Sequence, residues 1–120
     1  MKNFSVFEYC YCDASNHKAW GSLLLRGVAT NADVDILQHQ FASGCFFIAE
    51  QLFIPSLYSE LWAFTNGPSP DDHVWHTFHA LRSASAQDIT AQAFSSLESL
   101  IQKVKAVTAW DETLSPHWGN

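Results

Sequence analysis

Two apolar stretches of alternating pattern, joined by only six residues, place the strongest constraint on how this chain can fold. Residues 3–12 are rich in Phe, Val and Tyr and alternate loosely, which is typical of a strand with both faces at least partly covered. Residues 19–29 form a second apolar stretch, and residues 13–18 between them contain the turn formers Asp13 and Asn16. Because this loop is too short for a crossover connection, the two stretches are predicted to pair as an antiparallel hairpin.

Helical periodicity marks two later segments. The first begins at Thr30, which opens a capping box with Asp in place of the usual Glu or Gln, and it is expected to end at Gly44. The second covers residues 87–108, where apolar residues recur at helical spacing, and Ser85 or Thr90 could cap its start. These are the two main helices that the sequence predicts.

Shorter elements fill the space between these helices. Residues 45–49 and 73–82 are predicted strands, and Pro55 can open a short helical turn. Residues 65–72 are dense in residues that break regular structure, which predicts a loop. The apolar residues of the helical turn are expected to share one face: Leu57, Leu61 and Phe64.

This order of elements predicts an α+β domain. Strands outnumber crossover helices, which favours a mostly antiparallel sheet of about four strands with the two main helices packed on one face. The length of 120 residues suits one domain covering residues 1–120. The tail from about residue 111 is polar and expected to be loose, although its apolar residues could dock it: Trp110, Leu114 and Trp118.

Charge and cysteine content narrow the classes of function. The formal net charge is −6 and the six basic residues are scattered, which argues against direct binding of nucleic acid. No apolar run approaches the roughly 20 residues that span a bilayer. An odd count of three cysteines argues against a disulfide framework, so a cytoplasmic, reduced protein is expected. The pair Cys10 and Cys12 could serve a redox or soft-metal site, but buried cysteines are also ordinary core residues.

The densest cluster of chemically active side chains lies between Asp71 and His79. Three of the six histidines fall within these residues, behind two adjacent acids. Imidazole and carboxylate groups bind Zn, Fe or Mn, so one hypothesis is a metal site made by Asp72, His73 and His76. A second hypothesis is a metal-free ligand- or partner-binding site at Asp71, Asp72, His73 and Trp75, where a loop enters a strand.

The backbone conformation decides most of this question, although on a strand one histidine with Asp71 or Asp72 could still bind an ion, completed by groups from elsewhere such as Cys10, Cys12 or Glu50. On a helix the three histidines could line one stripe, whereas on a strand His73 and His79 lie about 20 Å apart and His76 points to the opposite face. Val, Trp, Thr and Phe among the histidines favour a strand. On that interpretation His76 is a core histidine with a satisfied ring and the other two lie on the surface.

Three motifs resemble a family of small uncharacterised bacterial proteins. They are Tyr9-x-Tyr11-x-Asp13-x-x-Asn16-x-Lys18-x-x-Gly21, the segment with Phe47-Ile48, Glu50-Gln51 and Ile54-Pro55-Ser56-Leu57, and Asp72-His73-x-Trp75-His76. The family usually has an acid after the last histidine, where this chain has Thr77. The resemblance implies a bacterial source and carries no activity.

Two classes of function therefore remain open. The first is a non-enzymatic interaction or regulatory protein without a cofactor, for example an immunity protein, that binds a protein partner or forms a homodimer. Sparse charge (15% of residues), abundant aromatic residues (14%) and net negative charge favour it. The alternative is a metal-dependent hydrolase that uses the Asp-His cluster at residues 71–79. The sequence contains no serine nucleophile elbow and no Gly-rich phosphate loop, and it identifies no catalytic residue.

Overall fold

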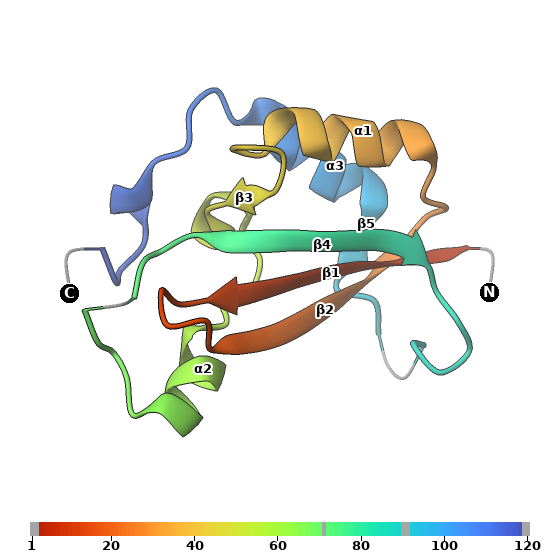
Figure 1. Cartoon of the computed structure of the whole chain (residues 1–120). Coiled ribbons are helices and arrows are strands. Elements are labelled where there is room, and N and C mark those ends of the chain that lie inside the picture. Colours follow the sequence, from red (N-terminus) through yellow and green to blue (C-terminus); the bar gives the residue numbers. More distant parts are fainter. Residues whose placement is uncertain (1–2, 71, 90–91, 119–120) are drawn as a thin grey trace.

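The computed structural model describes residues 3–70, 72–89 and 92–118, and these form a five-stranded sheet with three α-helices (Figure 1). The strand order is β3-β4-β1-β2-β5, in which β2 and β5 run parallel and the other neighbours are antiparallel. The predicted α+β class and mostly antiparallel sheet are thus confirmed. A fifth strand is added, and the short helical turn predicted after Pro55 corresponds to the third helix. Within these ranges, no helix has the length and apolar character needed to cross a membrane. The elements are β1 (Phe4–Cys12), β2 (Lys18–Arg26), α1 (Asn31–Gln40), β3 (Phe46–Phe47), the 3-10 helix η1 (Ala49–Leu52), α2 (Tyr58–Thr65), β4 (His76–Ser83), β5 (Ser95–Ser96), α3 (Leu97–Ala106) and the 3-10 helix η2 (Glu112–Leu114).

The predicted hairpin is present as β1 and β2. Its register runs from Phe4 opposite Arg26 to Cys12 opposite Lys18. The turn is closed by two backbone hydrogen bonds, from the Asp13 N–H to the His17 carbonyl (3.1 Å) and from the Asn16 N–H to the Asp13 carbonyl (3.0 Å). Asn16 adopts a positive φ of 68°, a conformation that asparagine tolerates better than most residues.

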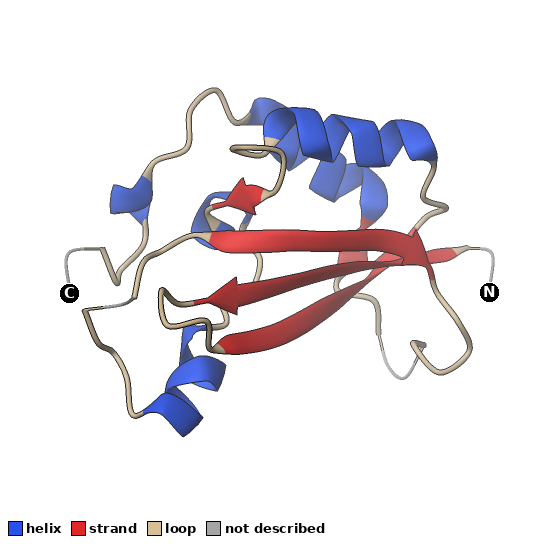
Figure 2. Ribbon diagram, in the orientation of Figure 1, coloured by secondary structure: helices blue, strands red, loops and turns tan. Residues whose placement is uncertain are grey.

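Side chains alternate between two sides of the sheet, and the helices among the described residues pack on one of them. Phe7, Tyr9 and Tyr11 of β1 belong to the main core cluster, together with buried residues of α1, α2 and α3. We call this the helix side. Figure 2 shows α1 and α3 lying together along the sheet. The intervening residues, among them Glu8 and Cys10, point to the opposite or outer side.

Helix α1 begins as predicted and ends earlier. The Thr30 side chain accepts a hydrogen bond from the Asp33 N–H, and the Asp33 carboxylate accepts one from the Thr30 N–H, so the capping box is complete. The helix stops at Gln40 because Phe41 turns to an extended backbone (φ −72°, ψ 142°) and buries its ring in the core. Gly44, the predicted end, lies in the following turn with φ +84°.

The helix predicted over residues 87–108 is wrong in its first half. The segment just before Leu97 lies at the edge of the sheet instead of forming a helix. There the Phe94 N–H donates to the Leu24 carbonyl, and β5 pairs with the end of β2. Ser96 is the residue that caps α3, accepting from the Ser99 N–H at 3.0 Å. Of the two predicted caps, Ser85 forms a turn with Asp88, whereas Thr90 lies outside the described residues.

The region between α1 and β4 contains less strand than predicted. Phe46–Phe47 pairs with β4, the Cys45 carbonyl accepts from the Phe78 N–H at 2.7 Å, and the chain then forms η1. Helix α2 follows, and its Leu61 is buried as expected, but Phe64 is 60% exposed and does not share the buried face. Leu57 packs against β2 at Gly21, where an added Cβ would lie 2.8 Å from a Leu57 methyl carbon.

Residues 111–118 lie against the rest of the chain through polar contacts. Ser115 is buried, and its hydroxyl donates to a Glu50 carboxylate oxygen at 3.0 Å. Of the apolar residues expected to dock this segment, Trp110 packs against the core, while Leu114 and Trp118 stay exposed.

Candidate functional site

The Asp-His segment spans the end of a loop and the beginning of β4. The structure confirms the strand interpretation for His76 to His79. His76 lies on the helix side and is fully buried, whereas Thr77 and His79 lie on the outer side. His73 precedes the strand, and Asp71 lies outside the described residues. The three histidines therefore occupy three different environments.

His76 is locked in the core. Its Nε2 accepts a hydrogen bond from the Leu57 N–H at 2.9 Å, so the ring proton is on Nδ1. This Nδ1 has no hydrogen-bond partner among the described residues, so the ring is only half satisfied. Burial lowers the pKa of His76 to about 3; repulsion from a charged His73 adds to this effect, and the Val74 carbonyl opposes it. The imidazole is thus neutral at physiological pH.

His73 is half-buried rather than on the surface, which corrects the expectation from sequence. Its Nε2 lies 2.7 Å from the Cys12 carbonyl oxygen, and because a carbonyl only accepts, this nitrogen donates. Its Nδ1 accepts from the Trp75 N–H at 3.0 Å. Nε2 therefore joins the segment before β4 to the end of β1, and Nδ1 fixes the ring to its own segment.

Asp72 is the centre of a hydrogen-bond network. One carboxylate oxygen accepts from the Tyr11 hydroxyl at 2.6 Å, and the other accepts from the Trp62 indole N–H at 3.0 Å and the Ser69 N–H at 2.7 Å. Partial burial acts to raise the pKa of Asp72, but these donors and His73 outweigh it and hold the pKa below its ordinary value. Asp72 is accordingly ionised at neutral pH.

This geometry does not suit the predicted metal ligands. Neither His73 nor His76 has a lone pair left for an ion without breaking a hydrogen bond described above. In the part of the chain that the structure describes, no group of three or more His, Cys, Asp or Glu side chains is placed to hold a metal ion. Asp72, His73 and His76 act instead as structural links between β1, α2 and β4.

Trp75, the fourth predicted binding residue, is also held from within the molecule. Its ring packs partly against the core, and its indole N–H donates to the Glu112 carboxylate at 3.0 Å. It thereby fastens residues 111–118 to the start of β4. A shallow hollow of about 370 Å³ beside it is lined by His73 and Phe46 among others.

Cys10 of the Cys-x-Cys pair does not lie in the environment of a reactive thiol. Cys10 is buried on the outer side of β1, and burial, followed by the neighbouring Cys12, raises the pKa of its thiol. None of the three cysteines forms a disulfide. A thiol with a raised pKa is a poor nucleophile at neutral pH.

Sequence reasoning missed a surface on the outer side of the sheet, which we call the Trp20 patch. It is a hollow of about 510 Å³ lined by Glu8, Trp20, Gly21, Ser22 and His79. Trp20 is 56% exposed, and its ring meets the His79 ring edge to face at 5.1 Å.

A β-bulge builds the Trp20 patch. Tyr9 pairs with Phe78 but Glu8 pairs with Ala80, so His79 is the extra residue of β4 at this step. Bulges re-aim side chains and are frequent beside functional sites. Strand alternation in the sequence could have placed both Trp20 and His79 on the side of the sheet opposite to the core residues. It does not show whether other segments cover them there.

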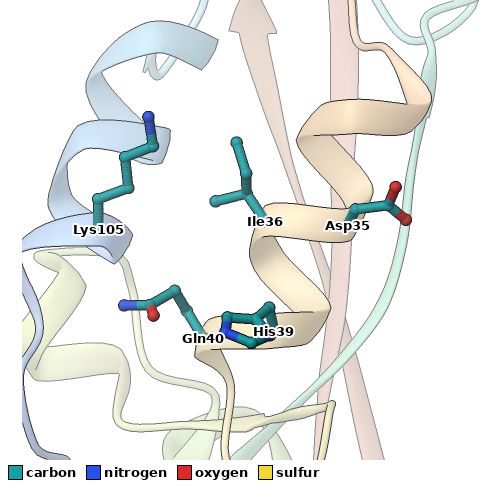
Figure 3. Close-up of a pocket in the computed structure, with 5 residues that line it drawn as sticks. All are labelled: Asp35, Ile36, His39, Gln40 and Lys105. Atoms are coloured by element: carbon teal, nitrogen blue, oxygen red, sulfur yellow. The ribbon is translucent and has the colours of Figure 1, made fainter.

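A further groove lies between α1 and α3, where Figure 3 shows Asp35, Ile36, His39 and Gln40 on one helix and Lys105 on the other. The Gln40 side-chain amide donates to the Val104 and Val107 carbonyls at the end of α3. In the figure the Asp35 carboxylate points away from α3. The groove therefore has no converging set of polar groups available to a ligand.

Comparison of the chain with protein-family models, with curated proteins and with solved structures gave no match. The resemblance of the three sequence motifs to small bacterial proteins stays a prediction. Function must therefore be argued from the geometry described above.

Proposed function

We propose that this chain is a non-enzymatic binding protein that contacts a protein partner through the Trp20 patch. The observation that carries the proposal is the 56% exposure of Trp20 on the side of the sheet opposite to the core cluster. Tryptophan is the residue type most enriched among the side chains that dominate binding energy at interfaces. Because about half of the Trp20 side chain is exposed to solvent, it has apolar surface left to bury against a partner.

The surroundings of Trp20 support this role. The patch is hollowed and combines the indole with polar groups, Glu8 and Ser22, at its margin, as expected of an interface with an apolar centre and a polar rim. Trp20 lies on β2 and His79 lies on β4, and both strands pair with β1. The Trp20 ring therefore stands on a rigid support. Rigid anchors bind with less loss of conformational entropy than anchors on loops.

Charge favours a basic partner. The chain carries a net charge of −6. Glu8 lines the patch but is paired with Arg82 at 3.4 Å, so this preference comes from the overall charge. Complementary charge accelerates association and excludes like-charged competitors. An inhibitor or immunity protein acting on a basic target is one concrete form of this function. The absence of disulfides among Cys10, Cys12 and Cys45 is compatible with a cytoplasmic protein.

The metal-dependent hydrolase has less support. It requires nitrogen lone pairs on His73 and His76, and both rings are engaged in internal hydrogen bonds. Asp72 already accepts hydrogen bonds from Tyr11, Trp62 and Ser69, so it offers an ion little further capacity. Freeing the two histidine nitrogens for a metal would cost several hydrogen bonds.

Site-specific photo-crosslinking tests the binding proposal. A photoreactive phenylalanine analogue at exposed Ser22 should capture a defined partner in extracts of the source cells, and Trp20→Ala should remove that product. The matched control carries the analogue at Ser59, which is equally exposed but lies on α2. A product of twice the chain mass identifies a second copy as the partner. Equal capture from Ser59, or capture that survives Trp20→Ala, would overturn the proposal.

A further inference from the structure

A second, smaller pocket lies far along the chain from Trp20, between the loop after α2, the segment before β4 and the tail. Its volume is about 210 Å³. Six of the residues that line it carry its chemistry: Trp62, Asp72, His73, Glu112, His117 and Trp118. We propose that this pocket binds a small organic cation with a methylated ammonium group.

The charge of the lining selects for a cation. Two carboxylates, Asp72 and Glu112, reach the pocket from different segments, and none of the described residues that line it is Lys or Arg. Both carboxylates are fixed by indole donors, Asp72 by Trp62 and Glu112 by Trp75. An ionised carboxylate accepts about four hydrogen bonds. Asp72 also accepts from Tyr11 and Ser69 and keeps room for about one more, whereas Glu112 accepts one side-chain bond and offers more of its capacity to a ligand.

The aromatic residues select for methyl groups on that cation. Trp62 and Trp118 both line the pocket, together with the His117 ring, which packs against Trp62 at 5.0 Å. Trp62 is held on another side by stacking on Tyr58 (5.6 Å between ring centroids). Tryptophan is the ring that attracts cations best, and aromatic cages are the usual receptors for quaternary ammonium groups.

Size limits the ligand. Pockets for drug-sized molecules usually enclose about 300–1,000 Å³, so a pocket of about 210 Å³ suits a ligand of a few heavy atoms. Trp118, which lines the pocket, is 50% exposed and is therefore accessible to a ligand from solvent. A compact alkylammonium ion fits the charge, the aromatic lining and the size together.

Nuclear magnetic resonance of the full chain provides a direct test, because each Trp indole N–H gives its own signal. Tetramethylammonium chloride, titrated at about pH 8 so that ordinary histidines are neutral, should shift the Trp62 and Trp118 indole signals saturably. The Trp20 signal should not move. Potassium chloride at equal ionic strength is the control for salt. We expect a dissociation constant of about 1 mM or lower.

Choline and its uncharged carbon analogue, 3,3-dimethylbutan-1-ol, separate charge from shape. Choline should bind about tenfold more tightly than the analogue. A peptide containing trimethyllysine identifies the source of the cation: tighter binding than choline would assign the site to a methylated side chain, and weaker binding would assign it to a free ion. Equal binding of choline and its neutral analogue would overturn the proposal.

Variants locate the site. Glu112→Gln and Trp118→Ala should each weaken tetramethylammonium about two- to fivefold, the loss expected for one contact at a partly exposed site. Trp20→Ala is the matched control and should leave the affinity unchanged. No saturable shift, or identical shifts in Glu112→Gln, Trp118→Ala and the unmodified chain, would refute the pocket. Neither result bears on the crosslinking test, since the Trp20 patch shares no lining residue with this pocket.

Discussion

His76 and His79 lie three residues apart on the same strand, β4, but their side chains lie on opposite sides of the sheet in different environments. His76 points to the helix side, is fully buried and accepts a hydrogen bond from the Leu57 N–H. His79 points to the outer side, is exposed and meets only the Trp20 ring among the contacts described above. One side of the sheet therefore uses its histidine to hold the fold together, and the other side presents its histidine to the surroundings.

The same contrast extends to the neighbours of each histidine. On the helix side, Tyr11 and Asp72 hydrogen-bond within the molecule. On the outer side, Trp20 leaves more than half of its surface in solvent. Residue type alone thus does not indicate a site in this molecule, because what covers each side of the sheet decides the role.

Substitution of each histidine is the most direct test of the different roles assigned to His76 and His79. His76→Ala should lower the free energy of unfolding by about 4 kcal/mol, because it leaves a core cavity and deprives the Leu57 N–H of its acceptor. His79→Ala should change it by less than about 0.5 kcal/mol. Chemical denaturation of both variants measures the difference, and similar losses would contradict the assigned environments.

Acid should destabilise the protein through His76. Its pKa of about 3 in the folded state lies below the ordinary value of 6.5, so the unfolded chain binds the proton more strongly. Stability from this residue is complete above about pH 6.5 and is lost as the pH falls toward 3, by about 3 kcal/mol between pH 7 and pH 4. Urea unfolding across this range measures the loss.

The control for this pH dependence is His76→Gln, which keeps a side-chain acceptor and cannot titrate. Its unfolding free energy should fall less steeply between pH 6 and pH 5, by about 1 kcal/mol less than that of the unmodified chain. His79→Gln should leave the slope intact. A slope that persists in His76→Gln would assign acid sensitivity to another group.

Removal of the Tyr11 hydroxyl should have an intermediate effect. The single proton of this hydroxyl lies within reach of two acceptors, Asp72 at 2.6 Å and the His73 carbonyl at 2.9 Å, and its oxygen accepts from the His73 N–H at 3.1 Å. Tyr11→Phe should cost about 2 kcal/mol, because it leaves partly buried polar groups without partners. Tyr9→Phe loses a single bond to the Pro55 carbonyl and should cost about 1 kcal/mol. Equal losses would argue against a network centred on Asp72.

Trp20→Ala should have the smallest effect on stability and the clearest effect on binding. We expect the unfolding free energy to change by less than about 1 kcal/mol, since the ring is largely exposed. Crosslinking from Ser22 should fall about tenfold or more, as for an interface anchor. A large loss of stability with unchanged crosslinking would reverse the roles assigned to the two sides.

Local chemistry explains which elements could be predicted from the sequence. The hairpin followed from alternation and turn residues, and the start of α1 followed from the capping box at Thr30. The first half of the helix predicted over residues 87–108 failed because the Phe94 N–H finds an acceptor on distant Leu24. A sheet edge competes with helical periodicity, and nothing in the local pattern records that competition.

The candidate site was predicted only in part, for a related reason. Alternation correctly assigned His76 to the core, because its nearest neighbours in the strand set its direction. It could not reveal that the Cys12 carbonyl binds His73, since that partner lies at the end of β1. It also could not reveal Trp20 as exposed, because exposure depends on which distant segments cover that part of the outer side of the sheet.

The central place of β1 has a consequence for synthesis of the chain. On the ribosome, β1 and β2 can pair as soon as Arg26 has emerged, but Ser5 finds its partner Ser83 only much later. Until β4 arrives, one edge of β1 presents unpaired backbone groups beside apolar side chains, and such an edge recruits other nascent strands. Chains released before His76 are therefore expected to aggregate, whereas chains released after Ser83 can close the centre of the sheet.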